Sequence, residues 1–326
     1  MSDQLTLPEG VDELEIYRRM RVARRFDERV LALRTSNVIE GPTHPAIGQE
    51  AVAVGVCAHL RPDEKITSTH RGHAHTISKG ADLRKMMAEL YGRDEGYCHG
   101  IGGSMHIADF DIGMLGANGI VAAGIPIALG AALANKLDGN PSAVVCFFSD
   151  GAVAAGPFHE CLNIAALWQL PILFLCENNG WAAGAAIEET VAAESPHMFA
   201  DGYGIAHSLV DGNDILAVMT AAKTALDHVR AEKGPYLLEA RTMRISVHAV
   251  RENMPPDNRD TTTMQQWAAK DPLQRHIESM WTRGVADQNA LERIHASVED
   301  LLDDAIAFAE AGHPPTLDRA LEAFRT

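Results

Sequence analysis

The sequence predicts an α/β fold, in which one parallel sheet carries helices on both of its faces. From about residue 121 onward, apolar runs of strand length alternate with longer stretches of helical periodicity. Such alternation is typical of parallel sheets, because each crossover between parallel strands needs a helix that covers one face. The chain has 326 residues, of which 46% are hydrophobic and 22% are charged, so it can bury a core of this size.

The expected elements follow one another in a regular order. An amphipathic helix covers about residues 11–35 and makes an N-terminal helical arm that ends near residue 36. The alternating part predicts helices at 121–137, 157–169 and 214–232 and strands at 143–148, 171–176, 206–210 and 236–240. A C-terminal helical segment is expected over 272–326. No repeat divides the chain, so residues 1–326 are predicted to form a single domain.

Two segments lack a clear period. Residues 65–119 are rich in glycine and carry several histidines in a polar setting, which indicates loops, and loops often hold functional groups. Residues 243–271 are polar and include Pro255 and Pro256. This second segment is predicted to be a long surface loop that could become ordered on binding.

Charge and composition exclude several classes of partner. The net charge of -16 argues against a general attraction to nucleic acid or anionic lipid. The acidic N-terminus does not resemble a secretion signal. The longest apolar run, 120–134, is too short to span a membrane and is expected to be a buried helix. The five cysteines are scattered without a CxxC pair, so neither a zinc site nor a disulfide framework is indicated, and we expect a cytoplasmic protein.

A polar turn follows the predicted strand 143–148. The segment SDGA at 149–152 stands where this strand leads into the next helix. Backbone N–H groups and the dipole at a helix N-terminus favour a bound anion, and an adjacent carboxylate can hold the divalent cation that a diphosphate brings with it. Asp150 could equally cap the helix, so this turn alone leaves both interpretations open.

A second polar turn, ENNGW at 177–181, follows the next predicted strand. Because the carboxyl ends of parallel strands meet at one edge of a sheet, Asp150 and Asn179 are expected to lie close together. Mg²⁺ prefers six hard oxygen ligands, and the Asp150 carboxylate, the Asn179 side-chain oxygen and a carbonyl near Trp181 could supply three of them. An asparagine pair can also form a plain turn, but the two turns together favour a metal-diphosphate site.

These two turns belong to a longer pattern that resembles a known family. The stretch from Ser149 to Trp181 is similar to the thiamine-diphosphate motif of the α subunits of 2-oxo acid dehydrogenase complexes. Other segments are also similar to this family: HPAIGQEAVAVG at 44–55, THRGHAH at 69–75, GIGGSMHIADFD at 100–111 and GANGIVAAG at 116–124. The resemblance covers about residues 11–241 and is closest to acetoin dehydrogenase α subunits. It implies the thiamine-diphosphate-binding fold and, within it, the diphosphate-binding domain.

The resemblance also implies roles for individual residues. Asp150, Asn179 and the carbonyl of Trp181 would bind Mg²⁺. The residues implied to bind the cofactor are His70, Arg71, Gly119, Val121, Asp150, Gly151, Ala152, Asn179, Trp181 and His248. Among them, Gly119 and Val121 would grip the aminopyrimidine edge through backbone groups.

Three histidines are implied to act in catalysis. His44 and His73 would face the reacting centre, and His248 would bind the diphosphate or the substrate and assist proton or acyl transfer. Each could instead be an ordinary hydrogen-bonded loop residue. Arg71, likewise, could form a surface salt bridge.

The implied enzyme is a thiamine-diphosphate- and Mg²⁺-dependent oxidoreductase. It would cleave acetoin or a 2-oxo acid and pass the product to a lipoyl group or another acceptor, with the cofactor supplying the difficult chemistry. In the family a β subunit carries the acid that activates the cofactor, so an α₂β₂ assembly is expected, and a lipoyl-bearing acyltransferase is a further possible partner. The alternatives are a pyruvate or branched-chain 2-oxo acid dehydrogenase α subunit, half of a split transketolase, and a non-catalytic partner of a β subunit.

Four positions depart from the family pattern. Ser149 replaces a glycine, Ala154 replaces an asparagine, and Ser246-Val247 precede His248 where an aromatic residue or histidine and then glycine are usual. Val247 is the departure of most concern, because a β-branched residue stiffens a loop that must order around the cofactor.

Overall fold

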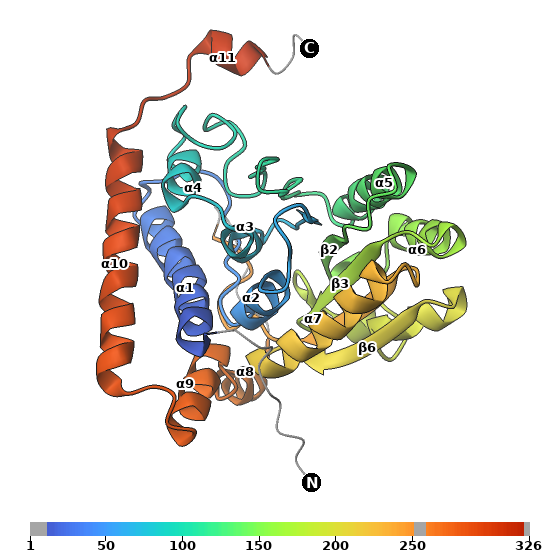
Figure 1. The fold of residues 1–326 in the computed structure, drawn as a ribbon. Helices are drawn as coiled ribbons and strands as arrows, with labels where there is room; N and C mark the ends of the chain where they lie inside the picture. Colours follow the sequence, from blue (N-terminus) through green and yellow to red (C-terminus); the bar gives the residue numbers. More distant parts are fainter. Residues whose placement is uncertain (1–11, 251–258, 323–326) are drawn as a thin grey trace.

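The computed structural model describes residues 12–250 and 259–322 and contains a five-stranded parallel sheet (Figure 1). In spatial order its strands are β1 (Lys65–Thr67), β2 (Val144–Ser149), β3 (Ile172–Asn178), β7 (Tyr236–Arg241) and β6 (Ala206–Asp211). All neighbouring strands pair in parallel, so their carboxyl ends share one edge. The structure thus confirms the predicted sheet and its four predicted strands.

Helices cover both faces of this sheet. They are α2 (Glu50–Cys57), α5 (Gly124–Leu137), α6 (Gly156–Trp168) and α7 (Ile215–Arg230). Alternate residues of a strand point to opposite faces. In β2, Val144, Cys146 and Phe148 pack with α5 and α6, while Val145 and Phe147 pack with α2 and α7. This alternation confirms the predicted fold class, and it explains why the strand reads as a continuous apolar run.

A further helical layer lies beside the sheet domain, at the left of Figure 1. It contains α1 (Glu13–Thr35), α3 (His73–Lys79), α4 (Leu83–Leu90), α9 (Pro272–Thr282) and α10 (Gln288–Ala311). Phe26 of α1, Met86 of α4 and Leu302 of α10 are fully buried in one apolar cluster. The predicted N-terminal arm and C-terminal helices therefore pack on each other. The remaining short elements are η1 (Asp150–Ala152), β4 (Trp181–Ala182), β5 (Ala185–Ala186), η2 (Ile187–Glu189), η3 (Pro196–Tyr203), α8 (Thr261–Ala268) and α11 (Leu317–Glu322).

The interpretation of residues 65–119 as loops is wrong in part. This segment contains β1, α3 and α4 as well as loops. α4 begins at Asp82, whose side chain accepts a hydrogen bond from the backbone N–H of Arg84 at 2.8 Å. Its apolar face then packs against α10. The surrounding glycines and histidines hide this short amphipathic pattern in the sequence.

The segment 243–271 also differs from its prediction. Thr43 and Val250 exchange two backbone hydrogen bonds of 3.2 and 2.9 Å, and Ile245 donates to the carbonyl of Ile47 at 2.9 Å. Residues 261–268 form α8, which Asp260 caps. The described parts of this segment are therefore held by backbone contacts and by α8, and residues 251–258 lie outside the described residues.

The apolar run 120–134 is only partly buried. Helix α5 begins at Gly124, and its Ile125 is fully buried, but Ile120, Val121 and Ile127 keep 72%, 52% and 46% of their surface exposed. The expectation of a buried helix is wrong on this side. No helix in the described ranges is long and apolar enough to cross a membrane.

A buried carboxylate organises the glycine-rich loop after α4. Glu89 is 1% exposed, and its two oxygens accept backbone hydrogen bonds of 2.7 to 2.9 Å from Cys98, Gly100, Gly102 and Gly103. A side chain at Gly100 would come within 2.4 Å of the backbone of Gly92. Only glycine therefore fits at position 100, where the loop folds back on itself. Glu89 supplies the hydrogen-bond acceptors for the backbone N–H groups of this turn.

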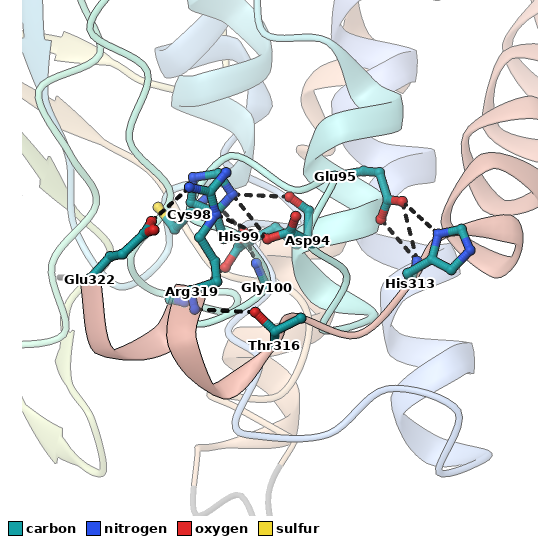
Figure 2. Close-up of polar contacts among 11 residues, drawn as sticks. Asp94, Glu95, Cys98, His99, Gly100, His313, Thr316, Arg319 and Glu322 are labelled. Carbon is teal, nitrogen blue, oxygen red and sulfur yellow. Dashed lines mark hydrogen bonds and ion pairs between the residues drawn. The ribbon is translucent and has the colours of Figure 1, made fainter.

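The C-terminal segment is attached to the outer side of this loop, as Figure 2 shows. The backbone N–H of Asp94 donates to the carbonyl of His313 at 2.8 Å, and the N–H of His313 donates to the Glu95 carboxylate at 3.0 Å. Arg319 of α11 reaches Asp94 at 3.4 Å. The loop is therefore held from inside by Glu89 and from outside by the end of the chain.

We expect Glu89→Ala to lower the free energy of unfolding by at least about 2 kcal/mol, because the four N–H groups would lose a buried acceptor. Denaturant titration of the full chain measures this. Glu95→Ala is the matched control: Glu95 lies in the same loop, its partner His313 is exposed, and its loss should cost clearly less than that of Glu89. Equal losses in the two variants would contradict the role assigned to Glu89.

Candidate active site

A cavity of about 330 Å³ lies at the carboxyl edge of β2 and β3. The predicted residues that line it are His44, His70, Arg71, Gly119, Val121, Gly151, Asn179, Trp181 and His248. These residues come from six separate parts of the chain, and the fold brings them to one place. Asp150 lies buried between Ser149 and Gly151, which both line the cavity.

Asp150 is a buried acid without a well-aligned hydrogen bond. The register of β2 and β3 pairs Ser149 with Glu177, so Asp150 and Asn179 follow neighbouring strand ends, as predicted. Asp150 is 0% exposed, and neither carboxylate oxygen has a hydrogen-bond partner among the described residues. Burial raises its pKa to about 6, although nearby N–H groups, including those of Gly151 and Trp181, oppose the shift.

The alternative in which Asp150 caps a helix does not hold. The N-cap of α6 is Ala155, five residues further on, and the N-cap of the short η1 is Ser149. The carboxylate is therefore free of any structural bond that would explain its burial. A buried acid in this state is a suitable ligand for a divalent cation, because the cation offsets the cost of ionising it.

The second turn is folded tightly beside Asp150. Asn179 is 5% exposed; its side-chain oxygen accepts from the N–H of Trp181 at 3.1 Å, and its amide donates to Gln49 at 3.2 Å. These bonds fix the amide orientation, and the oxygen keeps a second lone pair. A side chain at Gly151 would lie 3.0 Å from the Cβ of Ala182, so glycine permits the two turns to approach.

Arg71 is a buried cation on the opposite side of the cavity. It is 6% exposed and donates to the carbonyls of Pro45 and His248 at 2.6 and 3.1 Å. Burial lowers its pKa to about 10, so the guanidinium stays charged at neutral pH. No carboxylate within the described ranges approaches it within 4.0 Å. The alternative of a surface salt bridge is thereby excluded: in the described part of the chain, Asp27, Glu177 and Asp150 act on the Arg71 guanidinium only from a distance, and none is in direct contact with it.

Three histidines meet beside Arg71. The ring centroid of His44 lies 4.8 Å from that of His70 and 5.3 Å from that of His248. Burial, with Arg71 and the other two rings, lowers the pKa of His70 to about 2, so this ring is neutral. The ring nitrogens lie within 4.8 Å of one another and could take a transition metal, but the Arg71 guanidinium, 3.4 Å from His248 Nδ1, opposes a cation there.

The structure does not bring His73 to the cavity. Its Nδ1 lies 2.7 Å from Asp27 and its Nε2 lies 2.9 Å from the hydroxyl of Ser104. Asp27 also accepts from the backbone N–H of Ala46 at 2.6 Å. The ring is turned inward by these partners, so the expectation that His73 faces the reacting centre is not met, and His73 instead connects three segments that surround the cavity.

Two cofactor-binding expectations change in detail. Ala152 is 1% exposed and does not line the cavity, so only its backbone is available to a ligand. Gly119 lines the cavity with an ordinary backbone angle, and a side chain there would sit 3.5 Å from His106, an ordinary contact. Glycine is therefore not required at Gly119 by backbone conformation.

Two buried residues of the site were not predicted. Gln49 holds the amide of Asn179, and Glu177 lies 3.2 Å from His75, which in turn contacts Ser68 at 2.7 Å. Both line the cavity. Signals for them existed, because Gln49 lies within the GQEA segment and Glu177 begins the ENN turn. Gln49 differs from the predicted residues in that it acts on a ligand-binding residue, Asn179, through a hydrogen bond.

Comparisons with known proteins agree with this geometry. The family described as dehydrogenase E1 component matches residues 18–318. The acetoin:2,6-dichlorophenolindophenol oxidoreductase α subunits of Bacillus subtilis and Cupriavidus necator are 43% and 40% identical to this chain. Their alignments cover 91% and 93% of this chain and 88% and 90% of the relatives. The pyruvate dehydrogenase E1 component α subunit of Porphyra purpurea is 35% identical, over 93% of this chain and 90% of its own.

The family match confirms the predicted resemblance, and with it a thiamine-diphosphate-dependent oxidoreductase of the α-subunit type. The match extends over nearly all described elements, from α1 to α11. The chain belongs to the dehydrogenase E1 component family.

Proposed function

We propose that this chain is the α subunit of an acetoin dehydrogenase that holds thiamine diphosphate through Mg²⁺ and is active with a β subunit. One observation carries the proposal: Asp150 and Arg71 are both buried at one cavity, with opposite charges, and neither is in direct contact with a counter-ion from the described chain. Uncompensated buried charges are costly. A Mg²⁺-diphosphate group offers a cation to Asp150 and an anion to Arg71 at the same time.

The remaining residues fit the same ligand. Mg²⁺ would take the Asp150 carboxylate, the Asn179 side-chain oxygen and the carbonyl of Trp181. Besides Arg71, the groups proposed to hold the diphosphate are His70, His248 and the backbone N–H groups of Gly151 and Ala152. Backbone groups of Gly119 and Val121 would meet the aminopyrimidine edge. When bound, thiamine diphosphate supplies the nucleophilic carbon for cleavage beside a carbonyl.

The histidines divide the remaining tasks. His70 stays neutral because its pKa is lowered to about 2, so it serves as an uncharged hydrogen-bonding group. His44 and His248 are then the groups that can carry a proton near the substrate. Arg71 contacts both the ring and the carbonyl of His248, which keeps the ring at the cavity wall.

Two observations support a β partner, with α₂β₂ as the proposed assembly. Among the described residues, Glu177 is the one acid that lines the cavity, and it is held by His75, so the acid that activates the pyrimidine must come from elsewhere. At the cavity, Val121 and the adjacent Ile120 expose apolar surface that a second subunit could cover. The names of the relatives as α subunits point the same way.

The choice of acetoin rests on similarity, because relatives named for acetoin share 43% and 40% identity and a pyruvate dehydrogenase relative shares 35%. We propose a lipoyl-bearing acyltransferase as the acceptor of the two-carbon unit. A cytoplasmic location is also proposed; it is supported by the five cysteines, all of them free thiols, which suit a reducing compartment.

The first test uses Asp150→Asn without metal or cofactor. Burial raises the pKa of Asp150 from 3.8 to about 6, so protonated Asp150 is favoured in the fold. The contribution of Asp150 to the free energy of unfolding is therefore greatest below about pH 3.8, and it is lost as the pH rises through 6 and the folded chain must ionise this carboxyl group. Asp150→Asn escapes this loss and should be more stable than wild type above pH 6, by up to about 3 kcal/mol.

Thermal unfolding in a chelating buffer between pH 4.5 and 8 measures this difference. With Mg²⁺ and thiamine diphosphate the order should reverse, because wild type gains stability from the ligand and the variant loses a metal ligand. Equal stabilisation of both proteins by the ligand would show that Asp150 does not bind the metal.

The second test concerns His248. In the chain assembled with its β subunit, His248→Ala should lower turnover about 100-fold. It should weaken thiamine diphosphate binding by less than about tenfold, because Arg71 and the metal also hold the diphosphate. His313→Ala is the matched control, because that histidine is 84% exposed at the far end of the chain. A fully active His248→Ala enzyme would return His248 to the status of a loop residue.

The third test asks for the substrate and the partner. The chain alone should show no turnover, and addition of the β subunit should restore it, with acetoin preferred at least about tenfold over pyruvate and branched-chain 2-oxo acids. Activity is measured with an artificial electron acceptor. Turnover by the chain alone would overturn the two-subunit proposal, and no turnover with any substrate would favour a non-catalytic partner. Preference for pyruvate would overturn only the choice of acetoin.

A further inference from the structure

A second cavity, of about 530 Å³, lies at the other end of α3. The chain enters α3 from Arg71, which lines the cofactor cavity, and Ser78 and Lys79 at its C-terminal end line the second cavity. The opposite wall is formed by α1, which packs beside α3 in Figure 1. A helix of 7 residues therefore separates the two cavities.

Cations outnumber acids in the lining of this second cavity. Arg18, Arg19, Arg61 and Lys79 face only two acids, although the chain as a whole carries a net charge of -16. One of those acids, Glu15, is shared by Arg18 and Arg19 at 2.7 and 3.0 Å. Positive charge gathered in a cavity of an acidic protein attracts small anions.

Two polar groups at the end of α3 are not used by the fold. Lys79 forms no hydrogen bond or ion pair with the described part of the chain. The hydroxyl of Ser78 is buried and has no hydrogen-bond partner there. In the same helix, Thr76 donates normally to the carbonyl of Gly72 at 2.8 Å. The Ser78 hydroxyl is itself covered, whereas the Lys79 ammonium group lines the cavity and can donate to a ligand.

The rest of the cavity wall is apolar. Val22, Leu60, Ile112 and Leu301 line it. Burial raises the pKa of the Cys57 thiol to about 12, so this group is an uncharged part of the wall at neutral pH. A wall of this kind suits a ligand with a hydrocarbon body and not a fully hydrated ion.

From this geometry we propose that the second cavity binds a small organic anion, with a carboxylate or phosphate head on Lys79 and a short apolar body against Leu60 and Ile112. Arg61 lines the same cavity and also pairs with Glu64 at 3.3 Å. The site is separate from the cofactor cavity and does not depend on the proposed reaction. A ligand there would contact the C-terminal end of α3, the helix that follows Arg71 in the chain.

Calorimetric titration of the full chain tests this proposal with octanoate, neutral octanamide and inorganic phosphate as probes. Octanoate should bind at one site per chain, at least about tenfold more tightly than octanamide. Lys79→Gln should weaken octanoate binding at least about tenfold, and Lys79→Arg should retain it. Displacement of octanoate by phosphate would indicate a phosphate-bearing ligand, and failure of displacement a carboxylate.

Lys223→Gln is the matched control, because Lys223 is an exposed lysine paired with Asp227 on α7 and should leave octanoate binding unchanged. Arg61→Gln provides a second variant in case Lys79→Gln does not fold. Three results would overturn the proposal: no saturable octanoate binding up to roughly 5 mM, equal affinity in wild type and both cavity variants, or displacement of octanoate by thiamine diphosphate with Mg²⁺.

Discussion

The site depends on two charges that the fold buries without neutralising them. Asp150 is fixed by the β2–β3 register, and Arg71 is fixed by carbonyls of Pro45 and His248. Each position costs free energy in the empty chain, because a buried charge loses its hydration. This free-energy cost is explained by ligand binding, because both charges lie at the edge of the sheet where ligands of parallel α/β proteins bind. A more stable arrangement of the empty chain would be a poorer host for a Mg²⁺-diphosphate ligand.

Three sets of hydrogen bonds connect the outer helices to the segments at this edge of the sheet. Asp27 of α1 holds both His73 and Ala46, next to His44. Glu89 of α4 holds the loop that leads to Ser104, the other partner of His73. The C-terminal segment holds the outer side of that loop, where the backbone N–H of His313 donates to the Glu95 carboxylate. The helical layer therefore also positions the site, because its buried carboxylates, Asp27 and Glu89, hold the segments that carry the histidines.

The sequence predicts what is local and misses what depends on distant partners. β2 and β3 were predictable because buried parallel strands read as apolar runs, and Asp150 and Asn179 because each directly follows such a run. α3 and α4 were missed because glycines and histidines interrupt their short patterns. The direction of the His73 ring could not be read from a motif, since it is set by Asp27, 46 residues away in sequence. The bonds between Thr43 and Val250 are equally non-local.

The departures from the family pattern at Ser149, Ala154 and Val247 do not change the contacts that form the site. Val247 is 44% exposed, and the segment around it is held at Ile245 and Val250 by backbone bonds that any residue at 247 can accommodate. Its stiffness acts on a segment that is already fixed on both sides, so it does not have to oppose ordering. Ala154 is exposed, and Ser149 continues the β2–β3 pairing. What the chain must preserve is the pair of unneutralised charges and the glycine at 151 that lets Ala182 approach, and these positions are unchanged.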